Sequence, residues 1–211
     1  MIDRVEFETD EGVIMPERYG MILKSFSAPP PQPKIYRESL DGADGDVDMS
    51  EWAGEIRFAS RVVEVVLRDM TGQKHQRFVN LINGRRVKIR NSAMPGFYFS
   101  GRCEKTTVEA SQRVTDVTMR FTCDPYRLAS IPTVVSKAVT DTVTLMLSAE
   151  QKSVIPEITV DAQFTMDFDN RVYILPPGTY KLPSVVITKS MSRCILSGTG
   201  NVTFRWQDGV M

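Results

Sequence analysis

Three aspartates and a glutamate in a glycine-rich stretch are spaced like the ligands of a calcium-binding loop. Asp44, Asp46 and Asp48 take positions 1, 3 and 5 of an EF-hand count, and Glu55 takes position 12. Position 6 is Met49, although the sharp turn of such a loop needs glycine there. Aspartates in glycine-rich loops also accept hydrogen bonds from nearby backbone N–H groups. We therefore predict no metal site and interpret these side chains as turn carboxylates of an irregular loop.

Catalytic chemistry finds little support in the sequence. The single histidine, His75, has apolar neighbours at helical spacing, and no Gly-x-Ser-x-Gly nucleophile motif occurs. Two carboxylates could meet in space to cleave a glycoside, but nothing marks a particular pair. The segment from Gly198 to Gly200 begins like a dinucleotide loop, yet it lacks a third glycine and leads into a strand. We predict that the protein is not an enzyme and uses no cofactor.

A basic strand is the clearest charged feature. Arg86, Lys88 and Arg90 alternate with apolar residues, so they lie on one face, and Arg85 extends it. The whole chain balances 26 basic against 26 acidic residues, which argues against specific nucleic-acid binding through phosphate neutralisation. We interpret this face as solvated or as one side of a subunit contact.

The length and composition are those of a globular protein without membrane segments. The chain has 211 residues, of which 42% are hydrophobic and 25% charged, so it holds enough apolar material for a core. Its charged N-terminus predicts no secretory signal, and no apolar run approaches the ~20 residues of a membrane helix. Cys103, Cys123 and Cys194 are far apart, and we expect buried thiols made in a reducing cytosol.

Alternating apolar residues predict a mainly β chain with one short helix. Thr71 is expected to cap this helix, Phe78, Val79 and Ile82 to form its buried face, and Gly84 to end it. The central strand, from 55 to 70, has valines on both faces, so we expect it to be covered on both sides. Further strands in the first half are expected over 5–7, 21–26, 34–38, 86–90, 96–101, 105–110 and 113–123, and a proline run over 28–33 separates two of them.

Short strands separated by turn residues continue in the second half, the pattern of a small sandwich. A turn is predicted at Asp169-Asn170 and another at Pro176–Gly178. The apolar residues that mark these strands lie within 139–147, 158–160, 164–168, 172–175, 185–188, 194–196 and 202–206.

Several of these segments, in this order, resemble the distal tail protein family of long-tailed bacteriophages. The matching segments are the loop DGADGDVDMSEWAG, the helix QKHQRFVNLINGR, the strand GFYFSGR, the closing FTCDPYR and the ending GTGNVTFRWQDGVM. The resemblance implies an N-terminal ring-forming domain over 1–128, a β-sandwich with a helix and a β-hairpin. It also implies a smaller galectin-like β-sandwich over 129–211.

Proteins of this family form a six-fold ring at the end of the tail tube. The resemblance therefore implies a homohexamer at the virion tail tip, made in the cytoplasm of the bacterial host, through which DNA passes. The implied partners are the tail tube protein, the tail-tip protein and receptor-binding proteins. Cyclic closure needs two different patches on each subunit. We expect them among Asp44, Asp48 and Trp52, the basic strand with Arg86, Lys88 and Arg90, and the hairpin between Thr106 and Val114.

Two other functions fit the same sequence. One is a carbohydrate-binding module, suggested by a sandwich that carries Tyr173, Tyr180 and Trp206. The other is a tail-tube protein, which would have a similar β architecture but would polymerise into open tubes.

Overall fold

The chain folds into two compact units, Met1–Arg127 together with Met211, and Leu128–Val210. The computed structural model describes residues 3–39, 41–42, 44–52, 54–70, 74–111 and 114–211. Antiparallel strands dominate both units, and one short α-helix lies in the first, which confirms the predicted mainly β fold. Within the described residues, no helix is long and apolar enough to span a membrane.

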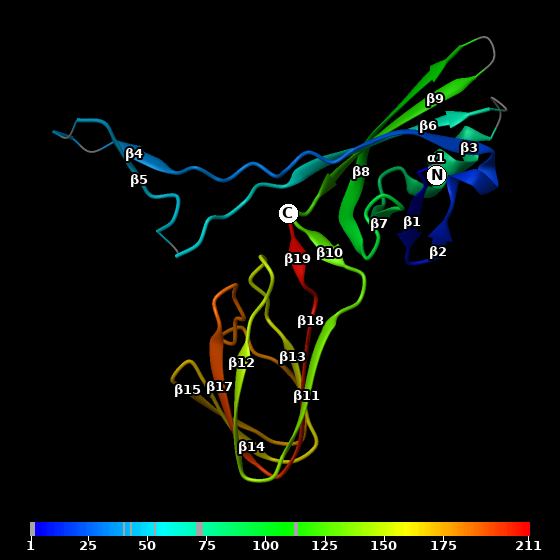
Figure 1. Cartoon of the computed structure of the whole chain (residues 1–211). Helices are drawn as coiled ribbons and strands as arrows, with labels where there is room; N and C mark the ends of the chain where they lie inside the picture. The colour runs from blue at the N-terminus through cyan, green and yellow to red at the C-terminus, as the bar shows by residue number, and fades with distance from the viewer. Residues whose placement is uncertain (1–2, 40, 43, 53, 71–73, 112–113) are drawn as a thin grey trace. The chain divides into compact units, whose positions relative to one another are not determined.

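A seven-stranded antiparallel path forms the first unit (Figure 1), in the order β2-β1-β7-β8-β9-β6-β3. A 3-10 helix, η1, precedes β3, and a separate pair, β4 and β5, lies outside this path. The elements are β1 (Val5–Thr9), β2 (Gly12–Ile14), η1 (Pro16–Tyr19), β3 (Met21–Ser27), β4 (Arg37–Ser39), β5 (Asp46–Asp48), β6 (Arg61–Asp69), α1 (His75–Ile82), β7 (Arg86–Asn91), β8 (Phe97–Ala110) and β9 (Thr115–Cys123).

Aromatic packing shows that this sheet bends over onto itself. In the sheet order, β7 and β8 separate β1 from β9, so a flat sheet would hold these two strands about 14 Å apart. Yet the rings of Phe7 on β1 and Phe121 on β9 are stacked with centroids only 5.6 Å apart. Phe78 of α1 meets Phe7 edge-on at 5.7 Å. The two ends of the sheet and the helix therefore share one core.

A buried carboxylate holds the start of the helix. Asp69, at the end of β6, is fully buried. Its Oδ2 atom accepts the backbone N–H groups of Lys74 and His75 at 3.1 and 3.0 Å. The same oxygen lies 3.1 Å from Nδ1 of His75. A negative group at a helix N-terminus is favourable, because it satisfies free N–H donors and opposes the helix dipole. The predicted cap, Thr71, lies outside the described residues.

The expectation that the central strand is covered on both sides is wrong for the single chain. Val63, Val65 and Leu67 of β6 are fully buried, but Val62 on the opposite face is 48% exposed. The strand begins at Arg61, and the preceding residues belong to a separate excursion of the chain. The stretch predicted as an irregular loop also contains β5, which pairs with β4.

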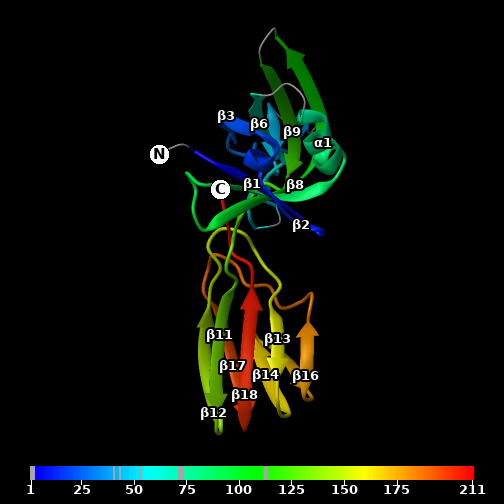
Figure 2. The same ribbon diagram turned by 90° about the vertical axis from the view of Figure 1, so that its right-hand side faces the viewer.

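A two-layer sandwich makes up the second unit. One sheet has the order β11-β18-β13-β16 and the other β12-β17-β14-β15, and their inner faces share one core. Figure 2 shows the first sheet in front of the second. The strands of the sandwich are β11 (Thr133–Val139), β12 (Thr142–Leu147), β13 (Glu157–Val160), β14 (Phe164–Phe168), β15 (Arg171–Leu175), β16 (Gly178–Lys181), β17 (Ser192–Gly198) and β18 (Gly200–Trp206). Two further short strands, β10 (Arg127–Ala129) and β19 (Gly209–Val210), pair with each other outside the two sheets.

Local signals in this unit are confirmed at the turn between β14 and β15. Asp169 and Asn170 have φ angles of 46° and 67°, the left-handed values that a tight two-residue hairpin turn requires.

The cysteines are also buried, as expected. Burial raises the pKa of Cys123 and of Cys194 to about 12, so both remain neutral thiols.

Gly101 should tolerate no side chain, because β8 and β9 approach too closely there. A Cβ atom at this position would lie 2.4 Å from Sγ of Cys123 and 2.6 Å from the carbonyl oxygen of Thr122. We expect Gly101→Ala to lower the free energy of unfolding by about 2 kcal/mol, the usual cost of overpacking. Urea titration would measure it, with Thr107→Ala, an exposed position on the same strand, as control. Equal stability of Gly101→Ala and the wild type would contradict this close packing.

Asp116 should make the stability of the first unit sensitive to acid. Its carboxylate accepts two hydrogen bonds from Arg68, at 2.8 and 3.0 Å, and one from Lys24 at 2.7 Å. Arg68 first, and then Lys24, hold the pKa of Asp116 well below its usual range. The resulting stabilisation is present above the unfolded-state pKa, about 3.9, and is lost as the pH falls toward the lower folded value.

Unfolding titrations from pH 7 to pH 3 would test this linkage. We expect Asp116→Asn to be less stable than the wild type at pH 7 and to lose less stability on acidification. The matched control is Asp141→Asn at an exposed site in the second unit, which should keep the wild-type pH dependence. If Asp116→Asn keeps the wild-type pH slope, this ion-pair network does not account for the acid sensitivity.

Candidate functional site

A long two-stranded excursion leaves the first unit between β3 and β6, and we call residues 34–57 the arm. Its two halves hydrogen-bond to each other: Lys34 N donates to the Arg57 carbonyl at 2.7 Å, and Met49 N donates to the Tyr36 carbonyl at 2.8 Å. The pair β4–β5 continues this pairing toward the tip. Figure 1 shows the two halves running side by side out to β4 and β5. A two-stranded ribbon has no second layer, so it cannot bury its own apolar side chains.

The arm carries the densest group of exposed apolar residues in the first unit. Trp52 is 75% exposed, although tryptophan is usually well buried. The other exposed apolar side chains of the arm are Ile35, Tyr36, Val47, Met49 and Ile56. Several large exposed apolar side chains on one ribbon are typical of an interaction site.

The arm is also strongly acidic. It holds seven acidic and three basic residues, a net charge of −4. Asp44 and Asp46 are exposed, and neither forms an ion pair with any described residue. Asp48 behaves as a turn carboxylate: Oδ1 accepts the N–H of Ser50 at 2.9 Å. Hydrogen bonds from the hydroxyl and then the backbone of Ser50 lower the pKa of Asp48.

A single buried guanidinium holds both ends of the arm. The Arg61 side chain donates to the carbonyl oxygens of Ala28 at 2.7 Å and of Pro29 at 2.9 and 2.5 Å, in the segment that leads into the arm. It also reaches the Pro125 carbonyl at 3.3 Å and lies 5.0 Å from the ring centre of Phe99. Burial lowers the pKa of Arg61 from its ordinary value, and nearby Arg127 contributes in the same sense. No local sequence pattern marks Arg61 for this role, because its carbonyl partners lie 32 to 64 positions away in the chain.

The predicted basic strand, β7, is matched by acidic residues of its own unit. Lys88 and Arg90 both pair with Glu8, at 2.7 and 2.5 Å, and their charges also lie over the Tyr98 ring. Arg86 pairs with Asp124 at 2.6 Å. The pKa of Glu8 is lowered by its bonds to Lys88 and Arg90. The structure thus places these three cations in ion pairs within the first unit. They lie away from Asp44, Asp48 and Trp52, the arm residues predicted for the same subunit contact.

The cations on and beside η1 and α1 are exposed, and the sequence pattern did not mark them as a site. Arg18 lies on η1, Arg77 lies on α1, and Lys74 immediately precedes α1. None of the three forms an ion pair with a described residue. The Tyr19 ring of η1 contacts Phe78 of α1, with centroids 5.6 Å apart, so the two elements pack together. The available signal was the segment 74–90, which has six basic residues and no acidic one.

The predicted hairpin is formed by the ends of β8 and β9. Its register runs from Cys103 opposite Phe121 to Ala110 opposite Thr115, with a bulge between Cys103 and Lys105. Residues 107–110 are exposed. The tip at 112–113 lies outside the described residues. The hairpin therefore projects Val108, which is 43% exposed, among polar and small side chains, and it remains a candidate contact.

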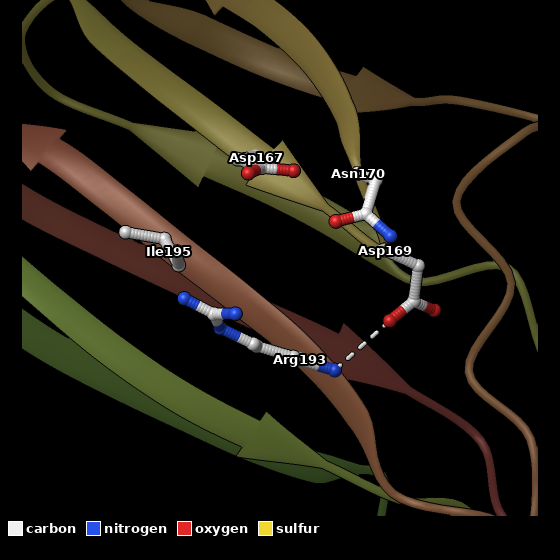
Figure 3. A pocket seen from close by; sticks show the side chains of 5 residues that line it. All are labelled: Asp167, Asp169, Asn170, Arg193 and Ile195. Carbon is white, nitrogen blue, oxygen red and sulfur yellow. Dashed lines mark hydrogen bonds between the residues drawn. The ribbon is translucent and has the colours of Figure 1, made fainter.

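The second unit has a small polar depression of about 150 Å³ on its β12-β17-β14-β15 sheet. Figure 3 shows Asp167, Asp169, Asn170, Arg193 and Ile195 around it. Asp169 Oδ1 accepts the backbone N–H of Arg193 at 3.0 Å, which fixes the turn against β17. Among the described residues, the buried Oδ1 atom of Asp167 has no hydrogen-bond partner. No described group of three or more His, Cys, Asp or Glu side chains could hold a metal ion.

The interpretation of Trp206 as a sugar-contacting ring is wrong. Trp206 is only 5% exposed and lies in the core of the second unit, where its Nε1–H donates to Asp208 at 3.0 Å. The hydroxyls of Tyr173 and Tyr180 donate to Ser184 and to the Pro176 carbonyl, at 2.8 and 2.7 Å. The three aromatic residues therefore do not form an exposed stacking platform.

Removing the Arg61 side chain should release the backbone at Ala28 and Pro29, which leads into the arm. We expect Arg61→Met to lower the free energy of unfolding by about 2 to 4 kcal/mol, because several carbonyls lose a charged donor. The arm should also be cut faster by trypsin at Lys34, Arg37 or Arg57 under native conditions. The control is Arg120→Met, which removes an exposed pair with Glu64 at 2.7 Å and should change stability by less than about 1 kcal/mol. Unchanged cleavage in Arg61→Met would show that the arm is held by other contacts.

Comparison with known proteins identifies the fold. The chain matches no protein-family model and no curated protein sequence. Its structure is similar to the crystal structure of the Dit protein of phage SPP1, with a TM-score of 0.68, 15% identity and coverage of 100% of both chains. That protein is described as a paradigm of the hub adsorption apparatus in phages infecting Gram-positive bacteria. A chain of the phage P2 baseplate in its activated conformation with calcium gives a TM-score of 0.50 at 10% identity, covering 100% of this chain and 99% of that one.

Proposed function

We propose that the protein is a structural component of a bacteriophage tail tip, a distal tail protein that forms the hub ring. The observation that carries the proposal is the likeness to the SPP1 Dit protein, which extends over the full length of both chains. A partial match could reflect a common β-sandwich alone. A match through both units, in one order and over the whole length, favours the same kind of molecule. The role is structural and non-enzymatic.

The ring is the arrangement that this proposal assigns to the chain. Six copies would close around the tail axis, joining the tail tube protein on one side to the tail-tip protein on the other, with DNA passing through. The domain over 1–128 would form the ring, and the galectin-like domain over 129–211 would lie outside it and carry receptor-binding proteins. The protein would then be found at the virion tail tip after synthesis in the host cytoplasm.

Closed cyclic symmetry requires a heterologous contact, in which one patch of each subunit meets a different patch of the next. Exposure supports the arm as one of these patches, since Trp52 and the free carboxylates of Asp44 and Asp46 are accessible. Among the six residues predicted for the contact, Asp44, Asp48 and Trp52 belong to the arm. Arg86, Lys88 and Arg90 stay candidates, but their charges are already balanced within the subunit.

Electron microscopy of the purified full-length chain would test the function. We expect closed rings with six-fold symmetry and, in solution, a mass of six chains by sedimentation velocity. A chain that stays monomeric at every concentration and fails to enter tails would overturn the proposal. Open tubes of stacked rings would instead identify a tail-tube protein.

A further inference from the structure

We propose that the acidic arm of one copy docks on the basic surface formed by η1 and α1 of the neighbouring copy. We call this surface, defined by Arg18, Lys74 and Arg77, the helix surface. The inference rests on the proposed ring and names the two different patches that a closed ring needs. The partner of the arm is thus a second copy of this chain.

Charge complementarity within the first unit is the first argument. The arm has a net charge of −4, whereas the other residues of 1–127 hold sixteen basic and twelve acidic residues, a net charge of +4. The cations of β7 already pair with Glu8 and Asp124, so their charges are balanced within the subunit. The helix surface keeps its cations unpaired, with Glu17 as the one exposed carboxylate described on η1 and α1. Complementary patches of this kind orient subunits and suppress wrong contacts.

The geometry of β6 makes this contact intermolecular. The arm rejoins the sheet at Arg61, the first residue of β6, while Asp69, the last residue, binds the start of α1. Nine residues of β-strand place these ends about 27 Å apart. Figure 1 shows the arm leaving one end of the sheet and α1 at the other. Because the arm extends away from the helix of its own copy, a contact between the acidic tip and a helix surface joins two copies. Each subunit then has an acidic surface at one end of β6 and a basic surface at the other, which is the arrangement that a closed head-to-tail ring needs.

Two exposed apolar side chains lie at the α1 end of β6. Met70 directly follows β6 and is 55% exposed, and Ile22 near the start of β3 is 46% exposed. Ile22 lies opposite Arg68 in the register of β3 and β6, so it faces outward at the same end of the strand. Arg68 alternates with the buried Leu67 and Asp69, so Ile22 projects from the sheet face opposite α1 and does not belong to the helix surface. The match between the arm and the helix surface is therefore one of charge.

A charge-swap experiment tests the contact on the full-length chain. One variant carries Asp44→Lys and Asp46→Lys in the arm, a second carries Lys74→Glu and Arg77→Glu, and a third carries all four changes. All four positions are exposed, so the fold should be kept, and circular dichroism would check this. The matched control carries Asp141→Lys and Lys189→Glu, exposed charges of the second unit. The readout is the concentration at half assembly, measured by sedimentation velocity.

We expect each double variant to raise the half-assembly concentration on the order of 100-fold, because like charges then face each other across the contact. The fourfold variant should return to within about tenfold of the wild type, and 1 M NaCl should weaken assembly of the wild type. Rings that form normally in both double variants, or no recovery in the fourfold variant, would overturn this inference and leave the ring itself standing. A wild type that never assembles would overturn the proposed function together with it.

Discussion

The buried guanidinium of Arg61 is the constraint on which the shape of the first unit depends. The two halves of the arm leave and rejoin the sheet beside a strand end, where the backbone carbonyls of Ala28 and Pro29 have no strand partner to satisfy them. One side chain supplies donors to both carbonyls and to Pro125. Its charge is tolerated because three carbonyl dipoles and the Phe99 ring lie against it. The arm can then extend as a ribbon without unravelling the sheet.

Apart from the contacts of Arg61 and its own backbone hydrogen bonds, the arm has no hydrophobic core to stabilise it. A ribbon of two strands offers hydrogen bonds but no core, and its apolar residues, including Trp52, remain in solvent. The sheet, by contrast, encloses Phe7, Phe78 and Phe121 in a single core by bending. A rigid body with an unsupported, acidic and apolar projection is physically suited to assembly, because the projection gains most from a partner.

Asp69 has the complementary role at the opposite end of β6. By accepting the first N–H groups of α1, this buried carboxylate fixes the helix next to η1 and presents their cations outward. The strand β6 therefore connects Arg61, which holds the backbone leading into the acidic arm, to Asp69, which holds the start of α1. The rigidity of β6, which pairs with β3 and β9 on its two sides, keeps these features at a constant separation.

The sequence by itself determined the local structure: the alternation of Val63, Val65 and Leu67, the helical spacing of Phe78 and Ile82, and the left-handed turn at Asp169-Asn170. Each of these depends on residues a few positions apart, so periodicity and turn chemistry suffice. Only the tertiary structure decided which charges and apolar groups stay free. Glu8 reaches Lys88 and Arg90 from a strand 80 residues away, β3 and β9 leave one face of Val62 uncovered, and the sandwich closes over Trp206. Burial and pairing come from strands distant in the chain, and no local pattern records which strands become neighbours.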